Sequence, residues 1–335
     1  MNMSVGLSGI AVGTAFGFVL QRGRFCLNTA FRNAFSIKEF TLLRAYVLAL
    51  VTAVIGANLL EQFGFLHLTG VRQQLSWLAN GLGGYVFGIG MVFAGGDGGS
   101  SWSRTGEGLT GSCMAALGLM IGAAAAGNGI LAPVVEHLRG FVLLAGTMPS
   151  MNEIVGMNKW VLIVFLSGAG LAFVFSGRTS YVSGRTGYGW KLAGFLVGFL
   201  AVLGLFASER TAGTASGITF PGPSGAMLNS IVASGNANWG VAMVAGIPLG
   251  AFISAWRLHE FSWRAPRAEV MIEQFGGGLL MGIGGLLAGG CTIGHGITGL
   301  AALSLASLVS MLGIAAGCWT MVYLLFMRNS TAQLR

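Results

Sequence analysis

The stretch "GYVFGIGMVFAGGD" at residues 84–97 returns as "GLLMGIGGLLAGGC" at residues 278–291, with seven of the fourteen positions identical. Both copies are apolar and glycine-rich, and the first ends in Asp97 whereas the second ends in Cys291. The apolar runs that contain them, 81–96 and 275–290, would extend only about 24 Å as helices, less than the hydrocarbon core of a bilayer. Paired short segments interrupted by glycine are typical of binding sites in membrane transporters. The repeat therefore predicts two half-helices that meet near the bilayer midplane.

The composition indicates a membrane protein. Hydrophobic residues make up 54% of the 335 residues, charged residues only 8%, and the mean hydropathy is +0.76. Soluble domains carry about 25% charged residues, so this chain lacks the polar surface of a soluble fold. The net charge of +8 comes from basic residues between apolar runs, a distribution that sets membrane orientation and does not indicate nucleic-acid binding. The four cysteines form no Cys-x-x-Cys motif and no Cys/His cluster, so we expect neither a metal site nor a cofactor.

The pattern of apolar runs predicts an all-α polytopic membrane protein. A spanning helix needs about 20 apolar residues. Candidate spans lie at 4–21, 42–60, 109–126, 129–146, 159–176, 190–207, 238–256 and 310–327, with shorter runs at 81–96, 224–234, 275–290 and 296–309. The weakest span is 129–146, because it contains Pro133, Glu136, His137 and Arg139. We expect about nine spanning helices plus half-helices in one transport domain over 1–335, with pseudo-symmetric halves at about 1–150 and 151–335.

Basic residues indicate the orientation of the chain. They cluster between the first two apolar runs, from Arg22 to Arg44, and in "RLHEFSWRAPR" at 257–267. Because cytoplasmic loops carry an excess of Lys and Arg, both segments are expected on the cytoplasmic side. We therefore expect the N-terminus outside and the C-terminus in the cytoplasm.

The first glycine-flanked break contains a basic pair and a cysteine. In "FGFVLQRGRFCLNTAFR" at 16–32, Cys26 follows Arg22 and Arg24, and cationic neighbours favour a thiolate and attract anions. The alternative is that Cys26 is a small buried filler and that the two arginines only set the topology.

The second break, "AGGDGGSSWSRTGEG" at 94–108, places Gly95 and Gly96 before Asp97. Glycines let a backbone approach a ligand closely, and N–H groups at helix starts bind anions. For Arg104 and Glu107 we expect a structural ion pair that caps the helix that follows.

The third break, "AGGCTIGHGITG" at 288–299, surrounds Cys291 with Gly289 and Gly290 and adds His295 four residues later. A catalytic Cys-His pair would also need a water-accessible pocket and an oxyanion site, which the pattern neither shows nor excludes. Two further cysteines lie in continuous apolar runs and are interpreted as packing residues: Cys113 and Cys318.

These motifs resemble the YeeE/YedE family of bacterial inner-membrane proteins, whose best-understood members take up thiosulfate. The resemblance rests on "GFVLQRGRFCLNTAFR" at 17–32, "GGYVFGIGMVFAGG" at 83–96 with "RTGEG" at 104–108, and "GGLLMGIGGLLAGGCTIGHGITG" at 277–299. It implies nine spanning helices, shorter helices that meet at the centre, and an hourglass shape with basic dents on both faces. It also implies a multi-pass protein of the bacterial inner membrane.

The resemblance further implies a narrow path lined by three cysteines that hand thiosulfate on through S–H hydrogen bonds. Two of these positions correspond to Cys26 and Cys291, whereas the middle position is Asp97 in this sequence. An ionised Asp97 would repel a dianion by about 4 kcal/mol per pair of unit charges 4 Å apart, at an effective dielectric constant of 20. We therefore expect a neutral carboxyl at this position, which would donate one hydrogen bond as a thiol does.

The sequence thus predicts a transporter, not an enzyme, for a small sulfur-containing anion, thiosulfate first. Cys26, Asp97 and Cys291 would line the path, and Arg22 and Arg24 would attract the anion on the cytoplasmic side. One alternative is transport of another sulfur or selenium species, with proton coupling at Asp97. A second alternative is a membrane thiol enzyme or a docking subunit for a sulfur carrier. The family resemblance also implies a small cytoplasmic sulfur-carrier protein as a partner.

Overall fold

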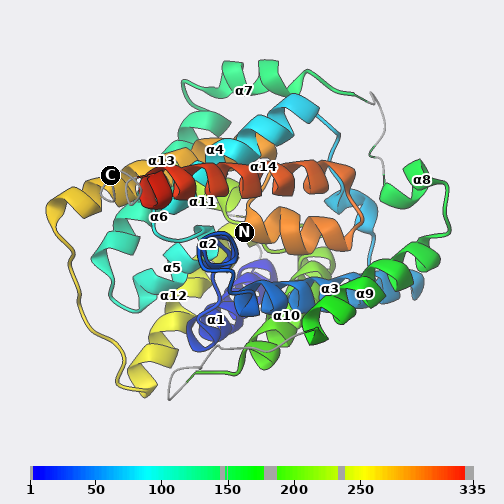
Figure 1. The fold of residues 1–335 in the computed structure, drawn as a ribbon, viewed down its shortest axis with the longest axis horizontal. Helices are drawn as coiled ribbons and strands as arrows, with labels where there is room; N and C mark the ends of the chain where they lie inside the picture. Colours follow the sequence, from blue (N-terminus) through cyan, green and yellow to red (C-terminus); the bar gives the residue numbers. More distant parts are fainter. Residues whose placement is uncertain (1–2, 144–147, 149, 177–186, 233–237, 329–335) are drawn as a thin grey trace.

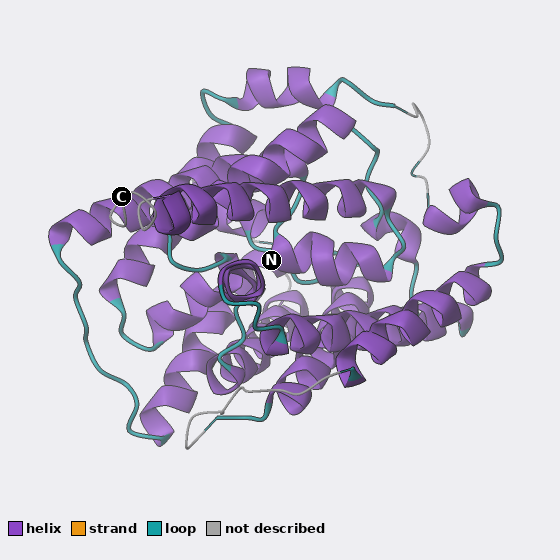
Figure 2. Cartoon of the chain, in the orientation of Figure 1, coloured by secondary structure: helices purple, strands orange, loops and turns teal. Residues whose placement is uncertain are grey.

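The computed structural model describes residues 3–143, 148, 150–176, 187–232 and 238–328. Within these ranges the chain is helical and contains no β-strand, as Figures 1 and 2 show. The elements are α1 (Met3–Gly23), α2 (Leu27–Ser36), α3 (Thr41–Gln62), η1 (Leu68–Val71), α4 (Trp77–Phe93), α5 (Gly98–Gly106), α6 (Thr110–Gly127), α7 (Ala132–Arg139), α8 (Met151–Val155), α9 (Lys159–Phe175), α10 (Trp190–Ala212), α11 (Pro221–Val232), α12 (Trp239–Arg257), α13 (Ala268–Ala288), η2 (Gly294–Gly299), α14 (Leu305–Val322) and η3 (Tyr323–Met327). The predicted all-α fold is confirmed.

Eight helical segments in the described ranges are long and apolar enough to cross a membrane. They contain α1 with α2, α3, α4 with α5, α6, α10, α12, α13, and α14 with η3. The 17 residues of α9 form a shorter apolar helix of about 26 Å, which is at the lower limit for a span. The chain is therefore a polytopic membrane protein.

Two of the predicted segments, one span and one half-helix, need correction. The run at 129–146 is not a spanning helix, because α7 has only eight residues (residues 144–146 lie outside the described ranges). Its N-terminal Pro133 and the charged Glu136 and Arg139 explain why the apolar run does not continue as a long helix. The run at 275–290 is longer than predicted, since α13 already begins at Ala268 and its 21 residues extend about 32 Å.

Close helix packing depends on glycine. A Cβ on Gly17 of α1 would overlap the backbone carbonyl of Ile247 in α12, so these two helices approach backbone to backbone. In the same way Gly90 of α4 lies against Gly277 of α13. Small residues at helix contacts are the usual means of tight packing inside a bilayer, where the hydrophobic effect does not drive helices together.

The two copies of the repeated stretch run in opposite directions. Near the start of α4, Gly83 lies against Ala288 at the end of α13, and near the end of α4, Gly90 lies against Gly277 in the middle of α13. The helices α4 and α13 are therefore antiparallel. Because α6 and α14 also pack on α13 and α4 respectively, the two repeat copies lie at the centre of one helical layer.

The helix ends define two faces of the molecule. Contacts of Gly13 with Met243 and of Gly17 with Ile247 make α1 and α12 parallel, so both helices end at the same face. The loop between α12 and α13 and the end of α14 lie at the left of Figure 1, and α8 lies at the right. We call the left-hand face the basic face, since it carries Arg22, Arg24, Lys38, Lys191, Arg257, Arg264, Arg267 and Arg328. The opposite face, called the α8 face, carries Arg72, Arg139, Lys159 and Arg210.

Candidate functional site

The three glycine-flanked breaks meet at the Asp97 carboxyl. Its Oδ2 accepts a hydrogen bond from the backbone N–H of Leu27, in the break between α1 and α2, at 3.3 Å. The same oxygen accepts a bond from the hydroxyl of Thr292, in the break between α13 and η2, at 3.2 Å. Asp97 itself lies between α4 and α5 and is only 1% exposed. One buried side chain thus joins three segments that are far apart in the sequence.

Asp97 also begins a helix. As the N-cap residue of α5 it accepts a bond from the backbone N–H of Ser100 at 2.8 Å, a contact that stabilises helix starts by about 1 kcal/mol. All three of these bonds have the Asp97 carboxyl as the acceptor. The sequence analysis expected a donor at this position, and the contacts correct that expectation because a helix start presents N–H groups to its cap.

Cys26 lies directly beside this junction. It precedes α2 as its N-cap residue, and it is 4% exposed. Its Sγ donates to the hydroxyl of Ser100 at 3.4 Å, and the Ser100 hydroxyl donates in turn to the backbone carbonyl of Asp97 at 3.1 Å. Cys26 and Asp97 are therefore connected through one serine.

Cys291 lies on the other side of the junction and is fully buried. The backbone N–H of Gly294 donates to its Sγ at 3.3 Å, and the hydroxyl of Thr219 lies 3.9 Å from the same atom. Thr292, which follows Cys291 in the sequence, contacts Asp97. A buried row of thiol, hydroxyl and carboxyl groups thus runs from Cys291 through Asp97 to Cys26.

The glycines of the repeat end their helices. Gly95 and Gly289 follow α4 and α13 at equivalent positions, and both adopt the left-handed conformation, with φ of +71° and +91°. That conformation is common where helices stop and costs glycine little. Gly290 lies against the ring of His295, where a Cβ would come within 3.0 Å of Nε2. The repeat is therefore a means of stopping two helices next to the same buried junction.

His295 is buried in the π-helical segment η2, and its backbone N–H donates to the carbonyl of Cys291 at 2.8 Å. Its Nδ1 is 3.1 Å from the hydroxyl of Ser307 in α14, and no hydrogen bond to the Cys291 thiol is formed among the described contacts. The structure therefore brings Cys26, Asp97 and Cys291 together, whereas His295 supports the segment behind them.

The predicted ion pair between Arg104 and Glu107 is wrong. Glu107 pairs instead with Arg24, at 3.0 Å, and Arg104 donates to the backbone carbonyl of Gly95 at 2.9 Å. The reason is that Glu107 ends α5 at the basic face, where the turn after α1 approaches it. Burial raises the pKa of Glu107 above its ordinary value, and the positive charges of Arg24 and Arg104 oppose that rise.

The two arginines of the first break have partners within the protein. Arg24 donates to Glu107 and also to Glu260, at 3.1 Å, so its charge is shared between two carboxylates. Arg22 lies over the ring of Tyr188, 5.3 Å from its centroid.

A cavity at the α8 face leads to Cys291. It has a volume of about 280 Å³, and its lining includes Thr219 and Gly294, both of which contact the Cys291 sulfur. Gln73 also lines it and donates to the carbonyl of Gly289 at 2.8 Å. A second cavity of about 380 Å³ shares Gln73 and Gly289 with the first and adds the guanidinium groups of Arg72 and Arg139.

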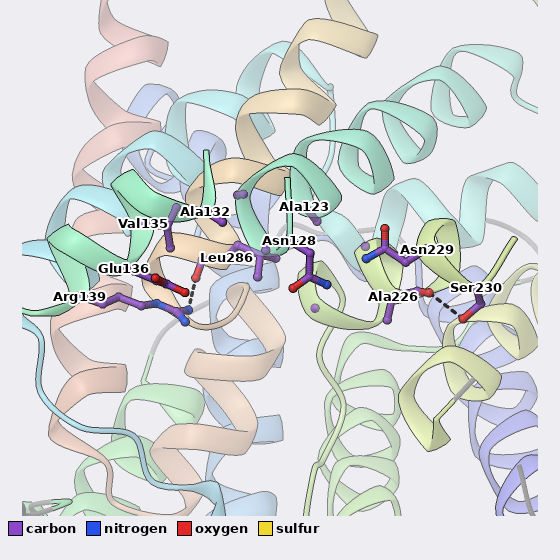
Figure 3. A pocket seen from close by; sticks show the side chains of 14 residues that line it. Ala123, Asn128, Ala132, Val135, Glu136, Arg139, Ala226, Asn229, Ser230 and Leu286 are labelled. Carbon is purple, nitrogen blue, oxygen red and sulfur yellow. Dashed lines mark hydrogen bonds between the residues drawn. The ribbon is translucent and has the colours of Figure 1, made fainter. Parts of the chain in front are cut away.

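A larger cavity of about 420 Å³ lies apart from this row of buried groups, between α6, α7, α11 and α13 (Figure 3). Its polar lining comes from Asn128, Glu136, Arg139, Asn229 and Ser230. Arg139 reaches across it to the carbonyl of Leu286, near the end of α13. Its lining contains neither Thr219 nor Gly294, the two contacts of the Cys291 sulfur that line the cavity of the α8 face.

The sequence analysis missed the hydroxyl groups that complete the site. Ser100 contacts Cys26, Thr219 lies beside the Cys291 sulfur, and Thr292 contacts Asp97. Ser100 had a recognisable signal, since it stands three residues after Asp97 where an N-cap bond is expected. Thr219 had none, because only the fold brings it next to Cys291.

The family model for sulphur transport matches residues 22–320. The chain belongs to this family. The thiosulfate transporter TsuA of Spirochaeta thermophila is 35% identical over 334 residues, 96% of this chain and 99% of that protein. The thiosulfate transporter TsuA of Escherichia coli is 32% identical over 340 residues, 96% of this chain and 95% of that protein.

A third relative, the probable transporter YedE of Escherichia coli, is 29% identical over 86 residues, 25% of this chain and 20% of that protein. The resemblance to the YeeE/YedE family that the three motifs indicated is confirmed. All three breaks, at Cys26, Asp97 and Cys291, lie inside the part of the chain that the sulphur transport family model matches.

Proposed function

We propose that this protein is a membrane transporter that takes up thiosulfate. The observation that carries the proposal is the buried row from Cys291 through Thr292, Asp97 and Ser100 to Cys26. Apart from the Asp97 carboxyl, its groups are thiols and hydroxyls, which donate hydrogen bonds to an anion without carrying a fixed charge. The two TsuA relatives, which match nearly the full length of the chain, are named for the same substrate.

In this proposal the anion enters from the α8 face. Arg72 and Arg139 raise the local concentration of anions in the second cavity, the one of about 380 Å³, because positive charge in a cleft attracts anions. The anion then passes Gln73 and Thr219, which line the cavity of about 280 Å³, and reaches Cys291, whose sulfur lies 3.9 Å from the Thr219 hydroxyl. Along the row, hydrogen bonds from thiols and hydroxyls successively replace the bonds that the anion makes to water.

Asp97 is the obstacle on this path. Its carboxyl holds Leu27 and Thr292 together and would repel a dianion if it stayed ionised. We propose that the carboxyl is neutral while the anion passes, so that it releases these donors to the anion. Proton coupling at Asp97 then accompanies transport of the sulfur anion.

We propose that the basic face is cytoplasmic and that the membrane is the bacterial inner membrane. Among the described Lys and Arg residues, the two faces carry the eight and the four named above, and cytoplasmic loops are the richer in these residues. The start of α1 then lies outside and the end of α14 inside. The antiparallel arrangement of α4 and α13 supports one transport domain with pseudo-symmetric halves at about 1–150 and 151–335.

Reporter fusions test this orientation. A tag inserted at Ser262, between α12 and α13, and a tag at the C-terminus are both expected to report the cytoplasm. A tag at Ile130, which is 89% exposed next to α7 on the α8 face, is expected to report the outside. Ser262 and Ile130 on the same side of the membrane would contradict the proposed topology.

A substrate panel tests the proposed function. Cells that express the protein are expected to take up radiolabelled thiosulfate, and excess unlabelled thiosulfate should compete better than sulfate, sulfite or selenite. If another sulfur or selenium anion competes better than thiosulfate, that anion and not thiosulfate is the substrate. A lasting persulfide or mixed disulfide on Cys26 or Cys291, detected by intact mass after exposure to thiosulfate, would favour a thiol enzyme instead.

We also propose a small cytoplasmic sulfur-carrier protein as a partner. It would receive the anion at the basic face, near the exit from Cys26. Co-purification of such a protein with the wild-type chain, lost on reversal of charge at Arg264 and Arg267, would support this partner.

A further inference from the structure

Arg24 occupies a strained position directly above the path. It follows α1, lies two residues before Cys26, and adopts a left-handed backbone conformation with φ of +47°. That conformation is unfavourable for a residue with a side chain by about 1–2 kcal/mol. The side chain is 51% exposed, whereas Cys26 is 4% exposed. The surrounding contacts must therefore hold this turn in place.

Two carboxylates from different elements provide those contacts. Glu107, which ends α5, accepts from Nη1 of Arg24 at 3.0 Å, and Glu260, which follows α12, accepts from Nη2 at 3.1 Å. We call Arg24, Glu107 and Glu260 the clasp. It joins the turn after α1 to α5 and to the loop after α12 on the basic face.

A buried hydrogen-bond network anchors one arm of the clasp. The amide of Gln21, in the last turn of α1, donates to Glu260 at 2.8 Å and accepts from the hydroxyl of Ser254 in α12 at 2.5 Å. Gln21 is 1% exposed and Ser254 is fully buried. The carboxyl of Glu260 is therefore fixed in position, and the Arg24 guanidinium is the exposed, movable part.

We infer that the clasp is the exit gate of the path, and that Arg24 exchanges its carboxylate partners for the transported anion. The inference rests on the proposed function, since it concerns the exit of that same path. An anion that leaves Cys26 toward the basic face meets the turn that Arg24 holds closed. It competes with Glu107 and Glu260 for the Arg24 guanidinium. When the anion displaces the two carboxylates, the turn after α1 is released and opens.

The energetics suit a gate. The Arg24 side chain is 51% exposed, so a competing anion can reach its guanidinium although Glu107 and Glu260 are only 10% and 26% exposed. Ion pairs between exposed groups contribute about 0–1 kcal/mol each. A guanidinium binds a small oxyanion with two parallel N–H groups as well as it binds a carboxylate. In the absence of the anion, the carboxylates of Glu107 and Glu260 bind Arg24 and keep the exit closed. Once the anion has bound Arg24, the same carboxylates compete for the guanidinium and release the anion.

The labelling rate of Cys26 tests the gate independently of transport. In a chain whose only cysteine is Cys26, an anionic, membrane-impermeant thiol reagent is applied to inside-out and right-side-out vesicles. Glu260→Gln and Glu107→Gln are each expected to speed labelling from the basic face about fivefold, the factor that corresponds to the loss of one such ion pair. The matched control is Glu61→Gln, which removes the partner of Lys159 at the α8 face and is expected to leave the rate unchanged.

A second control separates gating from general loosening of the fold. In a chain whose only cysteine is Cys113, which lies in α6 and is only partly buried, neither clasp variant is expected to change the labelling rate. Equal Cys26 labelling in Glu260→Gln, Glu107→Gln and the parent chain would overturn the gate. Faster labelling of Cys113 as well as Cys26 would also overturn it, because the clasp would then only hold the fold together.

The uptake assay distinguishes a failed gate from a failed transport proposal. Arg24→Gln is expected to speed labelling in the chain whose only cysteine is Cys26 and, in the chain with all four cysteines, to lower thiosulfate uptake. Glu260→Gln is expected to speed labelling in the first chain and to keep uptake in the second. If the clasp variants speed Cys26 labelling but the wild type takes up no thiosulfate, the gate stands and the proposal that thiosulfate is the substrate is rejected. Full uptake by Arg24→Gln would show that no anion uses this guanidinium and would overturn the exchange.

Discussion

Replacing Cys291 by alanine is expected to reduce thiosulfate uptake to the background of cells without the protein. Cys291 is fully buried beside two residues that line the cavity of the α8 face, and in the proposed path it is the first thiol that the anion meets. A hydrogen bond to a charged group is worth about 1.5–3 kcal/mol, so its loss at a constriction slows passage by at least tenfold. Uptake of radiolabelled thiosulfate, normalised to the amount of protein in the membrane, measures the effect.

Cys113 supplies the matched control. It lies in α6, is only partly buried and has no described contact with Cys26, Asp97 or Cys291. Cys113→Ala is therefore expected to transport as the wild type does. Cys318 is a poorer control than the sequence suggested, because its Sγ contacts Asn28 of α2 at 3.8 Å, close to the first break. Equal loss of uptake in Cys291→Ala and Cys113→Ala would show that the thiols serve packing alone.

Asp97→Ala is expected to abolish uptake and to lower the thermal stability of the protein. The change leaves the N–H groups of Leu27 and Ser100 and the hydroxyl of Thr292 without their acceptor in a buried site. Each such loss costs about 1–3 kcal/mol when the donor stays buried. Thermal unfolding in detergent and thiosulfate uptake together measure the two effects.

Two conservative variants separate the helix-capping role of Asp97 from its role on the path. Asp97→Asn keeps an oxygen that can cap α5, so stability should stay close to the wild type while uptake falls only in part. Asp97→Cys restores the cysteine that the family resemblance implies at this position and is expected to keep or increase thiosulfate uptake. If both variants are inactive and wild-type uptake rises with pH, the ionised carboxylate is required, and Asp97 binds a cation in place of passing an anion.

Two of the three breaks that meet at Asp97 could be predicted from the sequence because glycine marks the end of the helix before each of them. Helices that must stop inside a bilayer need residues that adopt left-handed conformations, and Gly95 and Gly289 do so at equivalent positions. The paired stretches therefore revealed both the membrane fold and two of the three breaks. The prediction that α13 is a half-helix was wrong, because residues 268–274 extend it although they are too polar to count as part of an apolar run.

Other features depended on contacts that no local pattern records. Arg104 and Glu107 are three residues apart, a spacing that favours a helical ion pair, yet the tertiary fold brings Arg24 to Glu107 from 83 positions away. The capping of α5 by Asp97 was visible in principle, because aspartate at a helix start is a common N-cap. That it also binds Leu27 and Thr292 follows only from the meeting of three breaks.

The most direct test of the account is flux through the purified chain. Proteoliposomes that contain only this protein are expected to accumulate radiolabelled thiosulfate, faster when the outside is acidic, whereas Cys291→Ala proteoliposomes stay at the level of empty liposomes. The same vesicles should not accumulate sulfate, which lacks the terminal sulfur. Thiosulfate accumulation that is equal in wild-type, Cys291→Ala and empty vesicles would contradict the proposal that this protein carries the anion through the row of groups between Cys291 and Cys26.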